Sequence, residues 1–155
     1  MQPANDLTIR PARRDDVPAI VALLADDPLG RGREENADPL PAAYWQAFDD
    51  IVAQGGNFLI VAEHDGAAVG CLQLTIIPGL SRRGMKRALI EAVRVSAACR
   101  GLGVGERLMR HAIGIARNAG CGLVELTSDA SRVDAHRFYQ RLGFVVSHVG
   151  FKLAL

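Results

Sequence analysis

The apolar positions along the chain recur with two different periods, one typical of strands and one typical of helices. In the N-terminal half they predict a short strand, an amphipathic helix, a second helix, and a pair of strands joined by an Asp-Gly turn. These elements cover Leu7–Arg10, Asp16–Ala25, Ala42–Ala53, Asn57–Glu63 and Ala67–Pro78.

The C-terminal half begins with a long apolar strand that starts near Arg87 and ends at Ser96. A helix, a strand, a helix and two closing strands follow, which the pattern assigns to Gly103–Asn118, Gly122–Ser128, Val133–Leu142, Phe144–Ser147 and Val149–Leu155. Strands outnumber helices, and the helices are interspersed among them. This order predicts an α/β (α+β) fold, a mixed sheet covered by helices, in a single domain that spans residues 1–155.

Two polar loops interrupt this pattern. The first, Asp26–Pro41, holds three prolines and seven charged residues. It is either a mobile connector or a lid that walls a substrate site, because long loops in compact domains are usually functional or disordered. The second loop, Gly79–Lys86, is rich in basic residues and is more typical of a solvated surface than of a site.

Charge and composition exclude several classes of function. The formal net charge at pH 7 is +1, so the chain lacks the basic field that binds nucleic acid or an anionic membrane. No stretch approaches the roughly 20 apolar residues of a membrane span, and Met1–Arg14 has no secretory-signal pattern. We therefore expect a cytoplasmic protein with neither nucleic acid nor membrane as a partner.

The three cysteines and four histidines lack the spacing of a metal site. Cys71, Cys99 and Cys121 are far apart in the sequence, and each is expected to pack as a small, reduced side chain. The sequence therefore predicts no metal.

The clearest chemical pattern is the segment Arg100–Gly105, which reads Arg-Gly-Leu-Gly-Val-Gly between a strand and a helix. Backbone N–H groups at such a turn, together with the helix dipole, bind anions and most often phosphate. The spacing is not the dinucleotide pattern, since its last glycine would fall at Glu106, and no P-loop lysine follows. Taken alone, the glycines are also consistent with a purely structural role, in which they only tighten the start of a helix.

Two segments together resemble the signatures of the GNAT superfamily of N-acetyltransferases. Arg100–Gly105 fits that family's acyl-CoA pyrophosphate loop, Gln/Arg-x-x-Gly-x-Gly/Ala, and Glu91–Val95 looks like the strand before it. Asp134–Phe144 resembles the second signature, a helix that carries Ala-x-x-Phe-Tyr and ends in Leu-Gly-Phe. The resemblance implies a mostly antiparallel central sheet of about seven strands with a splayed central pair, flanked by about four helices.

The resemblance also implies a reaction, the direct transfer of an acetyl group from acetyl-CoA, the cosubstrate, to a primary amine of a small molecule or peptide. Such a reaction needs a base for the amine and an acid for the departing thiolate. Tyr139 matches the tyrosine that the family uses as this acid. By its spacing alone, Tyr139 would instead be a core residue beside Phe138 and Leu142.

Glu91 is the candidate base. Strand alternation places it on one face with Leu89, Val93 and Val95, and apolar neighbours of that kind raise the pKa of a carboxyl group. Glu91 could instead be an ion-pair partner of Arg87 or of another arginine in the loop before it.

The resemblance assigns the cofactor to three places: the splayed strand, the glycine turn and the entry of the last helix. The residues concerned are Val93, Arg94, Val95, Arg100, Gly101, Leu102, Gly103, Val104, Gly105, Ser131 and Arg132. One position departs from the family, which often has asparagine seven residues before the helix tyrosine, where this chain has Arg132. Ser131 or Asp134 could cap the helix instead.

Two other functions compete with this one. A non-catalytic acyl-CoA-binding or sensor module on the same fold would bind acetyl-CoA and acetylate no amine. A Rossmann-type dinucleotide binder is disfavoured by the glycine spacing. No motif identifies the amine. The closing strands, Phe144–Leu155, could pair or swap between subunits and so form a homodimer.

Overall fold

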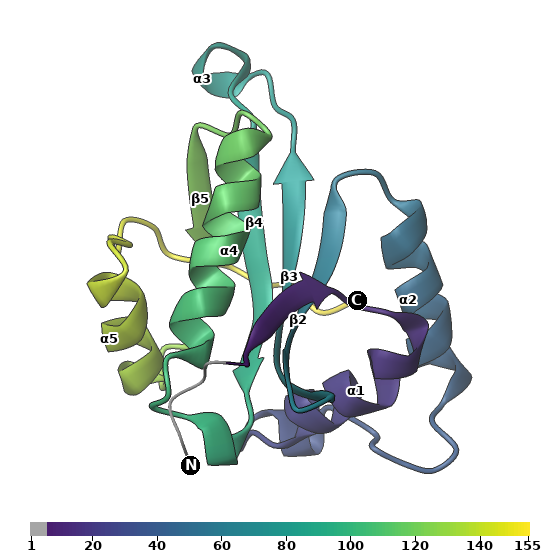
Figure 1. Cartoon of the computed structure of the whole chain (residues 1–155). Coiled ribbons are helices and arrows are strands. Elements are labelled where there is room, and N and C mark those ends of the chain that lie inside the picture. Colours follow the sequence, from purple (N-terminus) through teal and green to yellow (C-terminus); the bar gives the residue numbers. More distant parts are fainter. Residues whose placement is uncertain (1–5) are drawn as a thin grey trace. The chain divides into compact units, whose positions relative to one another are not determined.

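The computed structural model describes residues 6–155 (Figure 1). The strands are β1 (Thr8–Pro11), β2 (Asn57–His64), β3 (Ala67–Ile77), β4 (Arg87–Val95) and β5 (Leu123–Leu126). The helices are α1 (Val17–Ala25), α2 (Ala42–Ala53), the four-residue turn α3 (Ser81–Gly84), α4 (Val104–Asn118) and α5 (Val133–Arg141). Three short 3-10 turns cover Arg14–Asp16, Gly30–Gly32 and Ala97–Cys99. The chain forms two compact units, the first ending at Glu125 and the second covering Leu126–Leu155.

The first unit is built on a sheet whose strands follow each other in the order of the sequence, β1-β2-β3-β4-β5. The first three strand pairs are antiparallel, as predicted. The β2–β3 connection is the predicted tight turn, where Asp65 (φ 50°) and Gly66 (φ 77°) both adopt the left-handed conformation that suits a two-residue hairpin. β5 reaches its place beside β4 through α4, and the two strands point the same way (Figure 1).

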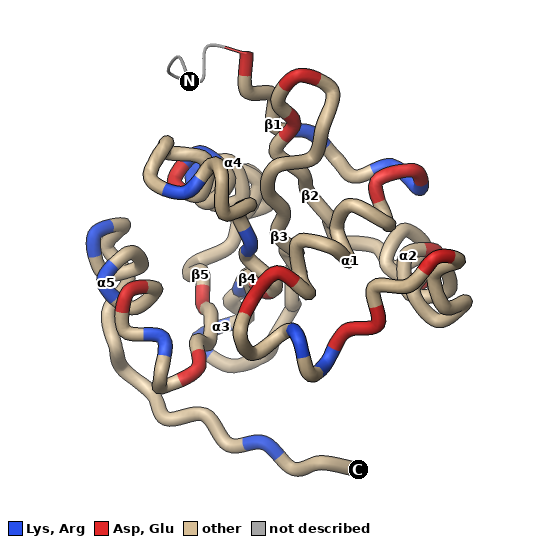
Figure 2. The backbone as a smooth tube through the Cα atoms, turned by 90° about the horizontal axis from the view of Figure 1, so that it is seen from below, with Lys and Arg blue, Asp and Glu red and all other residues tan. Residues whose placement is uncertain are grey.

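Helices cover both faces of the sheet (Figure 2). α1 and α2 pack on one face, where Ile20 and Leu23 meet Val61 and Cys71. α4 packs on the other face and approaches β3 closely, since a β-carbon at Gly70 would lie 3.0 Å from Leu108 Cδ1. The core between these layers is formed by side chains that are almost fully buried, among them Ile60, Leu72, Leu74, Ile90, Leu108 and Met109.

The ends of α4 follow from its sequence. Gly120, with φ 77°, lies just past the helix. The N–H of Cys121 donates to the Ala116 carbonyl (3.0 Å) and that of Gly120 to the Arg117 carbonyl (3.0 Å). These two bonds form a Schellman motif, which pairs carbonyls that the helix itself leaves unpaired.

A cluster of charges joins β1, β2 and the start of α1. The guanidinium of Arg10 donates to both carboxylate oxygens of Asp16 (2.7 and 2.9 Å) and to Glu63 (2.8 Å). The hydrogen bond from Arg10 is the main reason that the pKa of Asp16 lies below its ordinary value. Nearby, Arg14 pairs with Asp49 and lies 5.2 Å from the centre of the Trp45 ring, which links the turn before α1 to α2.

The second unit contains α5 and the residues around it. Gly143 has φ 95°, and the N–H of Phe144 donates to the Tyr139 carbonyl (3.1 Å), so this helix also ends in a Schellman motif. The ring of Tyr139 lies between those of Phe138 and Phe144, with centroids 5.3 and 6.1 Å away.

The two predicted closing strands, Phe144–Ser147 and Val149–Leu155, are wrong, because neither segment forms a strand. Alternating apolar residues set which face a strand would bury, but a strand exists only where a neighbour pairs with its backbone. Here Val145 and Phe151 stay exposed, by 81% and 93%. The sheet of the described residues therefore has five strands rather than about seven, and five α segments replace about four helices.

Within residues 6–155, no helix is both long enough and apolar enough to cross a membrane.

Candidate active site

A β-bulge interrupts β4 in its C-terminal half. Glu91 lies opposite Gln73 on β3, and Arg94 lies opposite Cys71. Ala92 and Val93 therefore share a single partner position on β3, which is the defining feature of a bulge. Ala92 accommodates the extra residue with φ 53°, a conformation that a non-glycine residue adopts only at an energetic cost.

The bulge changes which side chains share a face. Glu91 and Arg94 oppose residues two apart on β3, so both lie on the face covered by α1, where Cys71 packs. Val95 lies opposite Gly70 and belongs to the α4 face. The predicted alternation, which put Glu91 and Val95 on one face, is therefore wrong beyond the bulge. The side chain of Glu91 is also exposed.

Past the bulge, no strand of residues 6–155 pairs with one edge of β4, which is called the open edge here. The N–H of Ser96 donates to the Val69 carbonyl on β3 (2.8 Å), so the carbonyls of Val93 and Val95 point away from β3. β5 begins level with the start of β4, since the Gly122 N–H donates to the Lys86 carbonyl (2.8 Å). It has four residues against nine in β4, so it ends before the C-terminal half of β4.

Arginine side chains bind these two carbonyls. Arg94 Nη1 donates to the Val93 carbonyl (2.8 Å), and Arg100 Nε donates to the Val95 carbonyl (3.3 Å). Arg100 Nη2 also donates to the carbonyl of Asp26, at the end of α1 (3.3 Å). The predicted phosphate-binding arginine is thus hydrogen-bonded to both β4 and the first polar loop.

Arg94 also makes an ion pair, because its Nη2 lies 3.6 Å from Asp27 Oδ2. Asp27 is only 7% exposed, and its carboxylate also accepts the N–H of Gly30 (3.3 Å). The Nε of Arg94 is buried, and none of residues 6–155 provides it with a hydrogen-bond partner. Beside this pair, burial raises the pKa of the Cys71 thiol to about 12.

The glycine turn follows directly after β4. Cys99 in this turn is buried, and Gly101 and Gly103 each have φ 80°. A β-carbon at either glycine would meet no atom within 4 Å, so it is the left-handed backbone and not the available space that favours glycine. Gly103 is also the N-cap of α4, and it provides no side-chain cap to the N–H groups of the first helical turn.

α4 begins at Val104, which is buried, and Gly105 and Glu106 complete its first turn. The carboxylate of Glu106 pairs with Arg110 one turn later (2.7 Å). The turn from Gly101 to Gly105, with Leu102 at its tip, therefore has the backbone geometry of an anion site.

The remaining predicted residues lie in the second unit. Asp129 orders the entry of α5, since its carboxylate accepts the Ser131 N–H (2.9 Å) and the Ser131 hydroxyl (2.6 Å). Arg132 is the N-cap of α5 and makes no side-chain cap bond, and Ser131, one of the two residues that could cap the helix instead, lies before the N-cap. Asp134 lies in the first turn of α5, where the helix dipole stabilises its negative charge. The role of Tyr139 stays a prediction.

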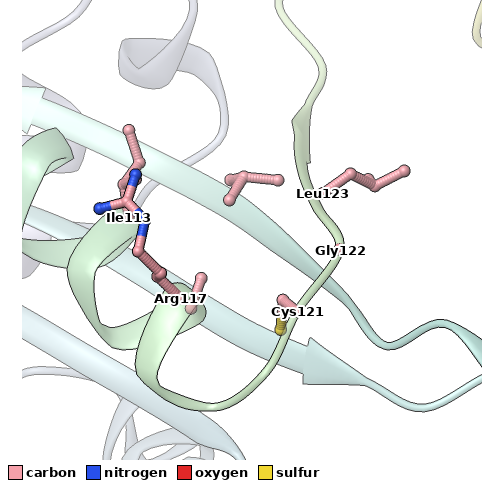
Figure 3. Close-up of a pocket in the computed structure, with 7 residues that line it drawn as sticks. Ile113, Arg117, Cys121, Gly122 and Leu123 are labelled. Carbon is pink, nitrogen blue, oxygen red and sulfur yellow. The ribbon is translucent and has the colours of Figure 1, made fainter.

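A cavity of about 230 Å³ lies between the C-terminal half of α4 and the start of β5 (Figure 3). Its lining is Ile113, Ala116, Arg117, Cys121, Gly122, Leu123 and Val124. None of these is a predicted site residue, and the glycine turn lies at the other end of α4. The cavity therefore does not mark the candidate site.

Sequence reasoning missed the bulge at Ala92 and both contacts between the β4 region and the first loop. An arginine inside an apolar strand was the one available signal, because a charge at such a position needs a partner. That signal points to Arg94 but not to Asp27, which lies 67 positions earlier in the chain.

Comparison with known proteins decides the family. The acetyltransferase (GNAT) family matches residues 18–144 of this chain. The chain belongs to the GNAT family. Members of this family are acyltransferases that bind acetyl-CoA and an amine acceptor, and this enzyme class applies here.

Two relatives are named N-acetyltransferases, and a similar solved structure carries a different description. An uncharacterized N-acetyltransferase, YhdJ of Bacillus subtilis (strain 168), is 32% identical over 110 residues, which are 70% of this chain and 76% of the relative. The aminoalkylphosphonate N-acetyltransferase of Salmonella typhimurium is 37% identical over 95 residues, 61% of either chain. A crystal structure described as a transcriptional regulator from Bacillus halodurans C-125 is 46% identical, with a TM-score of 0.94 over 96% of this GNAT protein and 99% of that chain.

Proposed function

We propose that this protein transfers the acetyl group of acetyl-CoA directly to a primary amine of a small molecule or peptide. One observation carries the proposal: the open edge of β4, at Val93 and Val95, leads straight into the glycine turn and the first turn of α4. An amide-bearing arm can pair with such an edge like an added strand. A diphosphate then falls at the start of the helix, where N–H groups and the dipole favour it.

The handle for the cofactor is the turn from Arg100 to Gly105. Gly101 and Gly103 give the backbone its left-handed conformation, and the N–H groups that follow supply donors for a phosphate. Arg100 adds a guanidinium that suits the two phosphates of a pyrophosphate. Ser131 and Arg132, at the entry of α5, complete the proposed set. When bound, acetyl-CoA supplies an activated acetyl group and a thiolate leaving group.

Glu91 is the proposed base. Its side chain is exposed on the α1 face of β4, directly before the bulge, so an amine or a bridging water can reach it. Removing a proton from the amine is required before attack, because an ammonium ion has no lone pair.

Tyr139 is the proposed acid. A phenol is neutral at pH 7 and can donate its proton to a departing thiolate. The packing of its ring against Phe138 and Phe144 restricts the directions that the hydroxyl can take.

Direct transfer is favoured over a covalent acyl-cysteine route. Cys71 lies against the bulge, with Sγ 3.7 Å from the Ala92 carbonyl, but a thiol with a pKa of about 12 is protonated at neutral pH. The nucleophile in such a route is the thiolate. Cys99 is buried in the turn.

The charge of the first loop favours a cationic acceptor. Residues 26–41 include five acidic and two basic side chains, a net charge of −3. This charge attracts an ammonium group toward the face of Glu91. The likeness to an aminoalkylphosphonate N-acetyltransferase places small aminoalkyl compounds first among the amines to be tried.

The test is to incubate a panel of amines with acetyl-CoA. The reaction is measured by the release of the CoA thiol and by mass spectrometry of the amine. Aminoalkylphosphonates, polyamines, amino acids, aminoglycosides and peptides cover the acceptor classes. We expect at least one amine to gain an acetyl group, with turnover that falls about 100-fold in Tyr139→Phe while the Kd for CoA is nearly unchanged. Turnover that Tyr139→Phe leaves unaltered would remove Tyr139 from the mechanism.

A second function, a non-catalytic acyl-CoA sensor, is favoured by the likeness to the protein described as a transcriptional regulator. A sensor binds acetyl-CoA and releases no CoA with any amine. The same panel, combined with a calorimetric titration of acetyl-CoA, therefore separates the two functions.

A further inference from the structure

Arg100 connects the glycine turn to the root of the first polar loop. Its guanidinium uses Nε for the Val95 carbonyl and Nη2 for the Asp26 carbonyl, both at 3.3 Å. Nε and Nη2 lie along one edge of the guanidinium, which is an edge that grips an anion with two parallel hydrogen bonds. The edge that a phosphate would use is therefore bonded to two neutral carbonyls.

Both carbonyls belong to functional parts of the protein. Val95 lies on the open edge of β4, where the proposed function puts the amide-bearing arm. Asp26 follows the last residue of α1 and begins the loop of residues 26–41. One side chain thus connects the proposed cofactor edge to the loop that supports the acceptor.

The root of the loop is compact, so a change at Asp26 affects its neighbours. A β-carbon at Gly30 would lie 1.9 Å from the Leu24 carbonyl oxygen, which leaves this turn no room to shift toward α1. Asp27 holds the Gly30 N–H and pairs with Arg94. Further along the loop, the Glu35 N–H donates to the hydroxyl of Tyr44 on α2 (2.9 Å).

We propose that Arg100 is a positioning residue shared between the cofactor and the loop. When acetyl-CoA binds, the guanidinium of Arg100 releases the Asp26 and Val95 carbonyls and donates to the pyrophosphate instead. A phosphate carries the charge opposite to that of the guanidinium and can accept two parallel hydrogen bonds from it, which a neutral carbonyl cannot do, so the phosphate wins the competition. The exchange exposes the Val95 carbonyl to the incoming arm and removes one of the bonds at the loop root. Cofactor binding is thereby communicated to the acceptor side.

This inference rests on the proposed function, because it requires CoA to bind at the glycine turn. Coupling of this kind is reciprocal, so an acceptor that reorders the loop also changes the affinity for CoA. Arg94 and Asp27 keep the loop attached to β4 while Arg100 moves.

The hydrogen-exchange rate of the loop, measured by mass spectrometry with and without CoA, tests whether Arg100 changes its hydrogen-bond partners. In the wild type, CoA should raise the exchange rate of peptides covering residues 26–34 about fivefold, the factor expected for the loss of one ordinary hydrogen bond. In Arg100→Ala and Arg100→Gln, the rate should be raised without CoA and should not change further when CoA is added. Arg100 is exposed, so both variants should fold.

Arg110→Ala is the matched control, since it removes an exposed arginine from the first half of α4 without touching the loop. This variant should keep the full wild-type response. Calorimetry on the same samples separates the two claims: failure of CoA to bind the wild type overturns the proposed function. Two results would overturn the role of Arg100. In the first, CoA binds and the hydrogen-exchange rate of the loop stays constant. In the second, CoA changes that rate equally in the wild type and in Arg100→Ala.

Discussion

Glu91 and Arg94 lie on the same face of β4 although they are three positions apart along the chain. In a regular strand, residues three apart point to opposite faces. The bulge at Ala92 adds the residue that brings the arginine to the face of the carboxylate, where Asp27 and the first loop also lie. The chemistry proposed for this face therefore depends on one alanine in a left-handed conformation.

Substitution of Ala92 tests the bulge. Ala92→Val should lower the free energy of unfolding by about 1–3 kcal/mol, because a β-branched side chain strongly disfavours a φ of 53°. Ala92→Gly should stay within about 1 kcal/mol of the wild type, since glycine accepts this conformation. Urea denaturation of the three proteins measures the difference. Equal stability of the valine and glycine variants would contradict the left-handed conformation at this position.

The role of Glu91 is tested by the pH dependence of kcat/KM with an accepted amine. A base must be deprotonated to act, so wild-type activity should fall as the pH falls. In Glu91→Gln this acidic limb should disappear, with turnover lowered by about 100-fold or more. Glu125→Gln is the control, because Glu125 is an exposed carboxylate that pairs with Arg87 (2.8 Å) outside the proposed site. An acidic limb that persists in Glu91→Gln would assign the base to another group.

Two glycines of the α4 region should respond in opposite ways to the same substitution. Gly103→Ala forces a β-carbon into a left-handed backbone, which costs roughly 1–2 kcal/mol and should weaken CoA binding at the turn. Gly114→Ala lies in the middle of α4, where a β-carbon meets no atom within 4 Å, and should stabilise the protein by about 0.5–1 kcal/mol.

Thermal unfolding and calorimetry with CoA on both variants check this pair. Gly114→Ala should bind CoA as tightly as the wild type does. If Gly103→Ala bound CoA with wild-type affinity and kept wild-type stability, the turn would not have the geometry described.

The Arg10 cluster makes stability depend on pH in a defined direction. The pKa of Asp16 is lowered in the folded protein, mainly by the hydrogen bond from Arg10, so the unfolded chain binds a proton at higher pH than the folded chain does. The resulting stabilisation is complete above the unfolded pKa of about 4 and is lost as the pH falls through the folded pKa.

Arg10→Met should therefore lower the free energy of unfolding at pH 7 by about 2 kcal/mol, the scale of hydrogen bonds to charged groups. The difference from the wild type should shrink as the pH falls through the folded pKa of Asp16. Urea denaturation of both proteins across this range measures it. A difference that stayed constant with pH would show that Arg10 does not act through the Asp16 carboxylate.

The elements that the sequence predicted well are those defined by local pattern. α2 has the predicted bounds because its apolar face is continuous and a glycine pair follows it. The β2–β3 hairpin forms around its Asp-Gly pair, and Gly120 ends α4. In each case the residues that determine the structure are neighbours in the chain.

The elements that the sequence predicted poorly depend on contacts between distant residues. The segment after Gly143 alternates as a strand does, but a strand needs a partner, and alternation does not supply one. The bulge falls on an ordinary alanine and is set by the pairing with β3. Likewise, no pattern in the sequence around Arg100 predicts its contact with Asp26, which lies 74 positions earlier.

The most direct test of the account is thermal unfolding in the presence of acetyl-CoA and, separately, NAD. A ligand at 100 times its Kd adds about 2.7 kcal/mol to the free energy of unfolding, which raises the Tm of a domain of this size by several degrees. If the glycine turn binds acetyl-CoA, acetyl-CoA should raise the Tm and NAD should not. A Tm raised by NAD and unchanged by acetyl-CoA would contradict this binding.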